Sequence, residues 1–351
     1  MTTANATVAR DTQLRIYELM VRIAEADRAI QRGLAAGELQ FQYYPCGGQE
    51  AIPAAIAQHL KPDDKMVTTY RGIHDIVAKG TPLTEIMAEM HGRVTGTSKG
   101  KGGPMHLSDP NSGMMVTTGI VGAGLPIANG IALAEQLRGT GRVTVVSFGD
   151  GATSIGAFHE ALNLAAAWDL PVVFVCQNNQ YAEYTAIAEY TKTRDFSQRA
   201  AAYSMRGIRV DGTDPLAVYE AAAEAIDHAR SGKGPVLLEA VCHRLQGHAF
   251  GSDEAHMDKA ALAEARKAAP VPRFRARLIA DQLATEDDLT AIEARVRSEV
   301  DAAMKFARES PQPGPEELYV DVFADPSLVP DHERGKVAAE EPQAPGADVR
   351  N

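Results

Sequence analysis

Residues 142–179, RVTVVSFGDGATSIGAFHEALNLAAAWDLPVVFVCQNN, contain the pattern that decides the fold. A near-continuous apolar run at 142–148 predicts a buried strand, and a second run at 171–176 predicts another. Between them, residues 156–168 carry apolar side chains at the spacing of an amphipathic helix. Strand, helix and strand in this order and of this length form a βαβ unit, which predicts a parallel sheet covered on both faces.

The alternation of apolar runs and helical patterns continues on both sides of this unit. We predict further strands at 66–70, 208–210 and 235–241, and helices at 14–34, 49–60, 83–91, 125–138, 215–230 and 286–308. Such alternation is typical of an α/β fold with a doubly wound, mostly parallel sheet and helices on both faces. The helix at 125–138 is rich in small residues and is expected to be buried, and the strand at 66–70 is expected to lead into a polar loop.

The composition of the chain changes along its length, which predicts four parts. We expect an N-terminal arm and helix at 1–40, an α/β domain at 41–255, a helical extension at 256–323 and an extended or disordered tail at 324–351. The tail is rich in Pro, Ala, Glu and Asp, a composition that does not favour a packed core.

Charge and cysteine usage exclude several classes of protein. The 351 residues include 35 Lys and Arg against 46 Asp and Glu, a net charge of −11, so no nucleic-acid partner is expected. The 3 cysteines are widely spaced without a CxxC pair, which excludes a disulfide framework and a cysteine zinc site. No run approaches the ~20 apolar residues of a membrane span. The first residues, MTTANATVARDTQ, lack a secretory apolar core, so we expect no membrane association and a cytoplasmic location.

Polar residues follow the two strands of the βαβ unit where ligands bind in parallel sheets. Asp150 comes directly after the first strand and Asn179 after the second, so their side chains are expected to converge. Carboxylate and amide oxygens suit Mg²⁺ or Ca²⁺. Gly149 and Gly151 allow an anion to approach the backbone, and the helix that follows favours a phosphate at its N-terminus. The residues therefore predict a site for a metal ion and a diphosphate.

The stretch GDGATSIGAFHEALNLAAAWDLPVVFVCQNNQYAEYT, residues 149–185, resembles the thiamine-diphosphate motif of the 2-oxo acid dehydrogenase family, alpha subunit. KGKGGPMHL, GIVGAGLPIANGIALA, RVDGTDP, SGKGPVLLEA and CHRLQGH are similar to segments of the same subunit and occur in its order. The resemblance covers roughly residues 40 to 255.

The resemblance implies a thiamine-diphosphate-binding fold over residues 41–255 and a dehydrogenase that uses thiamine diphosphate and Mg²⁺. Members of the family cleave the C–C bond next to a carbonyl of a 2-oxo acid or acetoin. They pass the acyl group to the lipoyl group of an acyltransferase. The resemblance also implies a beta subunit, in an assembly of two alpha and two beta chains. In this family the beta subunit supplies the glutamate that activates the cofactor. The alpha chain alone is then expected to be inactive.

The resemblance assigns roles to individual residues of this chain. The metal ligands implied are Asp150, Asn179 and, through its backbone carbonyl, Tyr181. The implied cofactor-binding residues are Tyr70, Arg71, Gly119, Ile120, Val121, Gly149, Asp150, Gly151, Ala152, Asn179, Tyr181, Arg244 and His248. His248 is the implied catalytic residue, because a histidine at the mouth of the site can assist acyl transfer.

The sequence departs from the family pattern at several positions. Ile73 occupies the place of a histidine found in many relatives, and the adjacent His74 has no assigned role. Ala249 replaces a serine that is often regulatory, so kinase control at that position is not expected. His106 is interpreted as a packing residue.

The substrate and two alternative functions stay open at this stage. The stretches QYAEYT and GAFHE resemble acetoin-cleaving members, but pyruvate and a branched-chain 2-oxo acid remain alternatives. The chain is alternatively a fragment of another thiamine enzyme, such as a transketolase-like lyase, or a non-catalytic module that binds magnesium and diphosphate. Neither alternative predicts a lipoyl acceptor.

Overall fold

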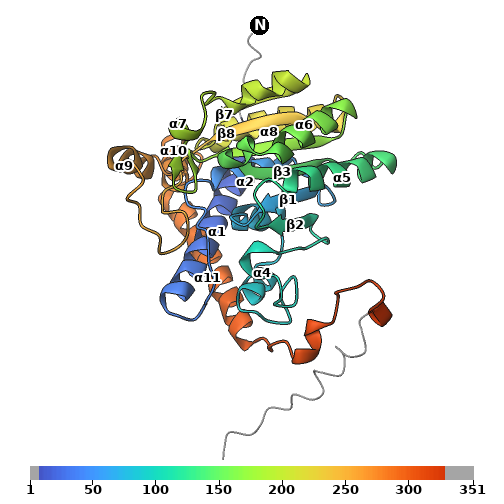
Figure 1. The fold of residues 1–351 in the computed structure, drawn as a ribbon. Helices are drawn as coiled ribbons and strands as arrows, with labels where there is room; N and C mark the ends of the chain where they lie inside the picture. The colour runs from blue at the N-terminus through green and yellow to red at the C-terminus, as the bar shows by residue number, and fades with distance from the viewer. Residues whose placement is uncertain (1–7, 329–351) are drawn as a thin grey trace, which may run out of the picture.

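A six-stranded parallel sheet forms the centre of the molecule in the computed structural model, which describes residues 8–328 (Figure 1). The strand order is β2-β1-β3-β4-β8-β7, and each neighbouring pair is parallel. The strands are β1 (Lys65–Thr69), β2 (Met114–Thr118), β3 (Thr144–Gly149), β4 (Val172–Asn178), β7 (Arg206–Asp211) and β8 (Val236–Val241). The predicted α/β class and parallel sheet are therefore confirmed.

The βαβ unit predicted from residues 142–179 is present, and its elements agree with the expected bounds to within two residues. Strands β3 and β4 are joined by α6 (Gly156–Ala167) and lie side by side. In their register Gly149 pairs with Gln177, so the residues that follow both strands leave the sheet at the same edge. The apolar side chains of β3 and β4 are buried because both faces of the sheet are covered.

Two apolar layers pack on the two faces of the sheet. One contains α1 (Arg10–Ala35), α2 (Ala51–Ile56), α3 (Ile73–Lys79), α4 (Leu83–Met90), α8 (Pro215–Arg230), α10 (Pro270–Ala280) and α11 (Glu286–Glu309). The other contains α5 (Gly124–Leu137) and α6. Along β3, Val145 faces the first layer and Val146 the second, as the pleat of a strand requires. The long C-terminal helix predicted at 286–308 is α11, which begins at a capping box between Thr285 and Asp288.

The structure corrects one local prediction and adds elements that the sequence does not predict. Residues 73–79, expected within a polar loop, form α3, whose Ile73, Ile76 and Val77 are buried against the core. The strand β2 was not predicted, because its sequence MMVTT is short and it lies at the edge of the sheet. A short hairpin of β5 (Tyr181–Ala182) and β6 (Thr185–Ala186) was not predicted either.

The small-residue helix, α5, is buried on one side only. Leu125, Ala128 and Ala132 pack against the sheet, whereas Ile127 is 40% and Leu137 79% exposed. The expectation that the whole helix is buried is therefore wrong for the single chain. Its small residues explain the close approach to the sheet, since a Cβ on Gly124 would lie 3.1 Å from Val67 Cγ1.

The remaining short elements complete the connections. They are α7 (Ile187–Tyr190), α9 (Lys259–Lys267) and the 3-10 turns at Ala57–His59, Gly103–Met105, Asp150–Ser154, Phe196–Tyr203, Pro315–Leu318 and Pro326–Leu328. Two predicted parts extend beyond the described residues. Residues 1–7 of the predicted N-terminal arm and residues 329–351 of the predicted tail lie outside them. Within residues 8–328 no helix is both long and apolar enough to span a membrane. Cys46, Cys176 and Cys242 are free and buried, and burial raises the pKa of each thiol well above its ordinary value.

The Gly-rich segment 96–103 folds around one buried carboxylate. Glu89 Oε2 accepts from the backbone N–H groups of Ser98 (2.8 Å) and Gly100 (2.9 Å). Glu89 Oε1 accepts from those of Gly102 (2.8 Å) and Gly103 (3.0 Å). Glu89 is 1% exposed, and a Cβ on Gly96 would lie only 2.6 Å from its backbone. The carboxylate therefore fixes the path of a loop that has few side chains of its own to pack.

Glu89→Gln is expected to lower the free energy of unfolding by about 1.5–3 kcal/mol, because an amide has one acceptor oxygen and its NH₂ group would face two backbone donors. Glu85→Gln on the same helix is the matched control, since the Glu85 side chain accepts no backbone hydrogen bond in the described structure. Urea unfolding of both variants measures the difference. Equal stability of the two variants would contradict this account of the loop.

Candidate active site

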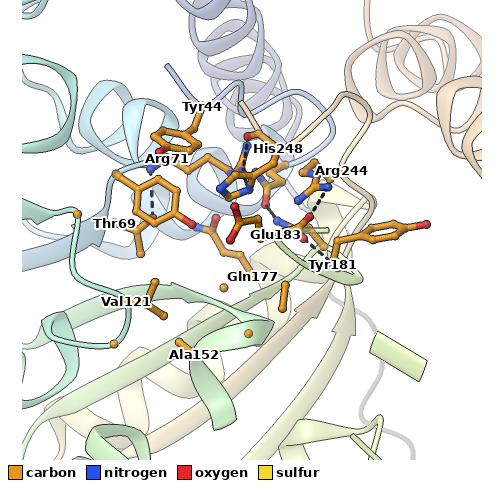
Figure 2. Close-up of a pocket in the computed structure, with 18 of the residues that line it drawn as sticks. Tyr44, Thr69, Arg71, Val121, Ala152, Gln177, Tyr181, Glu183, Arg244 and His248 are labelled. Carbon is orange, nitrogen blue, oxygen red and sulfur yellow. Dashed lines mark hydrogen bonds between the residues drawn. The ribbon is translucent and has the colours of Figure 1, made fainter. Parts of the chain in front are cut away.

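A cavity of about 410 Å³ opens at the carboxyl edge of the sheet (Figure 2). Its walls come from the residues that follow β1, β2, β3, β4 and β8. The chain crosses from β2 over β1 to reach β3, so the order of the strands reverses between β1 and β3. In open parallel sheets such a reversal leaves a crevice beyond the strand ends, and ligands bind there.

Most of the predicted site residues come together at this cavity. Those that line it are Tyr70, Arg71, Gly119, Val121, Gly149, Gly151, Ala152, Asn179, Tyr181, Arg244 and His248. Asp150 is fully buried between Gly149 and Gly151 and contacts Asn179. Ile120 does not line the cavity and its side chain is 70% exposed, because the turn after β2 directs it outward.

The Asp150 carboxylate is held between the ends of two strands. Its Oδ1 accepts from the backbone N–H of Asn179 at 3.2 Å, and its Oδ2 accepts from the Tyr190 hydroxyl at 2.5 Å. Burial raises the pKa of Asp150, although these hydrogen bonds act in the opposite direction. A buried carboxylate without an ion-pair partner in residues 8–328 is unfavourable unless a cation joins it.

Two hydrogen bonds orient the Asn179 side chain so that its Oδ1 faces the backbone of Tyr181. Its Nδ2 donates to Gln49 Oε1 at 3.1 Å, and its Oδ1 accepts from the backbone N–H of Tyr181 at 3.3 Å. One carboxylate, one amide oxygen and a backbone carbonyl are the hard oxygen ligands that Mg²⁺ takes. Within residues 8–328 no group of three His, Cys, Asp or Glu side chains could hold a metal ion, so a metal here would depend on this mixed set.

Two buried arginines face the cavity without an acidic partner. Arg71 donates from Nη1 to the Pro45 carbonyl (2.6 Å) and from Nη2 to the His248 carbonyl (3.1 Å). Arg244 donates from Nη2 to the Glu183 carbonyl (2.8 Å). Burial lowers the pKa of Arg71, and burial together with Arg71 lowers that of Arg244 to about 10. Arg71 and Arg244 make no ion pair in the described part of the chain. Two buried cations at one cavity therefore form a site for an anion.

His248 lies beside these arginines and is neutral at neutral pH. Burial first, and then the charges of Arg71 and Arg244, lower its pKa to about 4. Its ring packs edge-on against Tyr44, with 5.0 Å between the centroids. Figure 2 shows His248 at the upper rim of the cavity beside Arg71. A neutral imidazole there can accept a proton from a bound molecule.

Gln49 is the main site residue that sequence reasoning missed. Its Nε2 is buried and has no hydrogen-bond partner within residues 8–328, although the residue lines the cavity. Such a donor fits an anionic ligand. The signal was weak, because one glutamine in CGGQE shows no chemistry until the fold brings it to Asn179. The other unpredicted lining residues are Tyr44, Thr69, Met105, Gly122, Gln177, Ala182 and Glu183.

His74, which had no assigned role, lies behind the cavity wall. Its Nε2 is 2.6 Å from Gln177 Oε1, and Gln177 Nε2 donates to Asp75 at 3.2 Å. His74 and Asp75 are both buried, so they fix the side chain of Gln177, which lines the cavity. The interpretation of His106 as a packing residue is wrong, because His106 is exposed next to Met105 at the cavity.

The fold and the cavity together define a class of protein: a parallel α/β enzyme that holds an anionic, metal-bound cofactor at the carboxyl edge of its sheet. The family described as "Dehydrogenase E1 component" matches residues 18–316. The chain belongs to this family.

Curated relatives cover nearly the whole chain. The alpha subunit of acetoin:2,6-dichlorophenolindophenol oxidoreductase from Bacillus subtilis is 39% identical over 90% of this chain and 95% of its own. The subunit of the same name from Cupriavidus necator is 37% identical over 90% and 95%. The pyruvate dehydrogenase E1 component subunit alpha of Rhizobium meliloti is 36% identical over 91% and 92%.

These comparisons confirm the predicted family. The chain is an alpha-type chain of the thiamine-diphosphate-dependent dehydrogenases, which are oxidoreductases acting on 2-oxo acids or acetoin. Membership in the family implies thiamine diphosphate as the cofactor.

Proposed function

We propose that thiamine diphosphate binds in this cavity with its diphosphate against Arg71, Arg244, Gln49 and His248. The observation that carries the proposal is the pair of buried arginines that make no ion pair within residues 8–328, together with the buried Gln49 Nε2, which has no hydrogen-bond partner there. In the same proposal Mg²⁺ is held by the side chains of Asp150 and Asn179 and by the Tyr181 carbonyl. The proposed residues run from Gln49 to His248, inside the proposed α/β domain of residues 41–255.

Thiamine diphosphate, when bound, supplies the carbanion that attacks the substrate carbonyl and allows the adjacent C–C bond to break. The residues of this chain then have three tasks. Arg71 and Arg244 balance the diphosphate charge, and their burial strengthens that attraction. Gly119, Val121 and Tyr70 line the cavity and are assigned to the cofactor rings. The neutral His248 ring accepts or returns a proton at the mouth of the site.

The partner that completes the site is proposed to be a beta subunit, in an assembly of two alpha and two beta chains. Exposed apolar side chains near the mouth of the cavity support this. Ile120 is 70%, Tyr184 50%, Val121 48% and Phe250 38% exposed. An uncovered group of this kind at a ligand site is expected where another chain packs. The names of the acetoin oxidoreductase relative and of the pyruvate dehydrogenase relative both contain the words subunit alpha, which supports a beta subunit as the partner.

The reaction we propose is cleavage of acetoin or a pyruvate-type 2-oxo acid, with transfer of the acyl group to the lipoyl group of an acyltransferase. The acetoin oxidoreductase relatives support acetoin, and the pyruvate dehydrogenase relatives support pyruvate. The buried, free cysteines fit the reducing compartment expected from the sequence, such as the cytoplasm. A transketolase-like lyase would need no lipoyl acceptor, and a non-catalytic module would show no turnover.

The test is to co-express the chain with its beta subunit and to compare the pair with the chain alone. Calorimetry should detect thiamine diphosphate binding to the pair in the presence of Mg²⁺. Acetoin or pyruvate should be oxidised with dichlorophenolindophenol as the electron acceptor, and lipoyl acylation should follow with the acyltransferase.

The chain alone should form dimers or aggregates and show no turnover, because half of the site is missing. Size-exclusion chromatography and the same assays measure this. An active monomer of this chain would contradict the proposed assembly, and a pair that binds the cofactor without turnover of either substrate would contradict the proposed reaction.

A further inference from the structure

One acidic side chain projects into the cavity without an ion-pair partner in residues 8–328. Glu183 lies at the turn between β5 and β6, and Figure 2 shows it near His248 in the middle of the cavity. Its carboxylate makes no hydrogen bond or ion pair within residues 8–328, and the residue is exposed. Only its backbone is held, since the Glu183 carbonyl accepts from Arg244 Nη2 at 2.8 Å.

The backbone of Glu183 is in an uncommon conformation for its residue type. Its φ is +54°, in the left-handed region that glycine and asparagine adopt more easily. Such a conformation has a cost that the surrounding structure must offset, and it is common at ligand sites. The hairpin and the Arg244 hydrogen bond therefore hold a carboxylate where glycine or asparagine would be less strained.

Backbone carbonyls hold both arginines of the cavity in place, and the proposed function assigns their charges to the diphosphate, which leaves neither for this carboxylate or for a second anion. Arg71 is bonded to the carbonyls of Pro45 and His248. Arg244 is bonded to the carbonyls of Glu183 and Gln246 and lies 2.8 Å from His256 Nε2. The open sides of both arginines are assigned to the diphosphate in the proposed function. His248 carries no charge at neutral pH.

A substrate that carries its own carboxylate would therefore meet a like charge in this chain. A hydroxyketone carries no charge, and its hydroxyl group can donate a hydrogen bond to a carboxylate. The two substrate classes of the family differ in this respect, because a 2-oxo acid is an anion and acetoin is neutral.

We propose that Glu183 is a specificity-determining residue that disfavours 2-oxo acids and favours an uncharged hydroxyketone of the acetoin type. This inference rests on the proposed function, since it assumes that the substrate enters the cavity beside the cofactor. It assigns the choice of substrate to a position on the β5–β6 turn.

The experiment uses the alpha and beta chains together, loaded with thiamine diphosphate and Mg²⁺. The values of kcat/KM for acetoin and pyruvate are measured with dichlorophenolindophenol for the wild type, Glu183→Gln and Glu220→Gln. Glu220 is an exposed carboxylate on α8, outside the cavity, and serves as the matched control. Binding of oxamate, an unreactive anion of the size of pyruvate, is measured by calorimetry on the same proteins.

The wild type is expected to prefer acetoin. Glu183→Gln should shift the ratio of the two kcat/KM values about 10-fold towards pyruvate and tighten oxamate binding by about the same factor. Both effects should shrink as the ionic strength rises, because the residue is exposed. Glu220→Gln should change neither quantity, and Glu183→Gln should bind thiamine diphosphate at least as tightly as the wild type, because a like charge near the diphosphate is removed.

Four outcomes would overturn the inference. A wild-type preference for pyruvate removes its premise. An unchanged ratio and unchanged oxamate binding in Glu183→Gln show that the carboxylate does not select the substrate, even if the enzyme is active as proposed. Loss of cofactor affinity in Glu183→Gln with an unchanged ratio assigns the residue to the cofactor. A complex that neither binds thiamine diphosphate nor turns over either substrate contradicts the proposed function itself, and the inference with it.

Discussion

Asp150→Ala is expected to weaken binding of thiamine diphosphate with Mg²⁺ by at least about 10-fold, or about 1.4 kcal/mol, because it removes the charged ligand of the proposed metal site. Asn179→Ala should act in the same direction. The affinity is measured by calorimetry on the complete complex, with each variant paired with the wild-type beta subunit. Wild-type affinity in both variants would show that the metal is held elsewhere.

The stability of the cofactor-free protein separates this role from a structural one. The pKa of Asp150 is raised in the folded chain, so folding disfavours its charged form at neutral pH. The stability associated with this group is fully present below its unfolded pKa and is lost as the pH rises through the higher folded value. Asp150→Asn removes the buried charge and is expected to keep or raise the unfolding temperature without ligand. The increase in that temperature on adding cofactor and Mg²⁺ should become smaller. A lower unfolding temperature in the absence of ligand would instead indicate that Asp150 mainly stabilises the fold.

His248→Ala is expected to reduce acyl transfer to the lipoyl acceptor by about 10²–10⁴-fold, the usual range for loss of a general acid or base. Substrate cleavage measured with dichlorophenolindophenol should fall much less. In the cofactor-free chain, burial and the charges of Arg71 and Arg244 lower the pKa of His248 to about 4, so a neutral imidazole is available to exchange protons.

The alternative for His248 is a role in holding the diphosphate alone. It predicts that both half-reactions fall equally and that cofactor affinity drops sharply in His248→Ala. His256→Ala serves as a comparison, because His256 contacts Arg244 but does not line the cavity. His256→Ala should leave the ratio of the two half-reactions unchanged.

The central part of the fold was predictable because local patterns and tertiary packing agree there. The apolar runs of β3 and β4 are buried on both faces, and the helical period of α6 matches its contact with the sheet. The segment of α3 contains buried His74 and Asp75 among its apolar residues. Their hydrogen bonds to Gln177, more than 100 positions away, offset the cost of burial, and no local pattern records such a partner.

The candidate site was predictable where a residue type is tied to a strand end, as at Asp150 and Asn179. Gln49 and Glu183 are not predicted because their importance depends on geometry. Gln49 has a buried donor without a partner in the described part of the chain, and Glu183 has a carboxylate in a cavity that two arginines also line. The outward direction of Ile120 depends on the turn after β2, which the pattern GIVG does not determine.

The three buried thiols allow the opening of the two core layers to be followed separately. Cys46 and Cys242 belong to the layer that contains α1 and α11, whereas Cys176 belongs to the layer that contains α5 and α6. A thiol reagent can modify each sulfur only when the chain around it opens, because the native side chains are inaccessible and protonated. The rate at which each cysteine is alkylated in the native protein therefore reports the local unfolding of one side of the sheet, without any label having to be introduced.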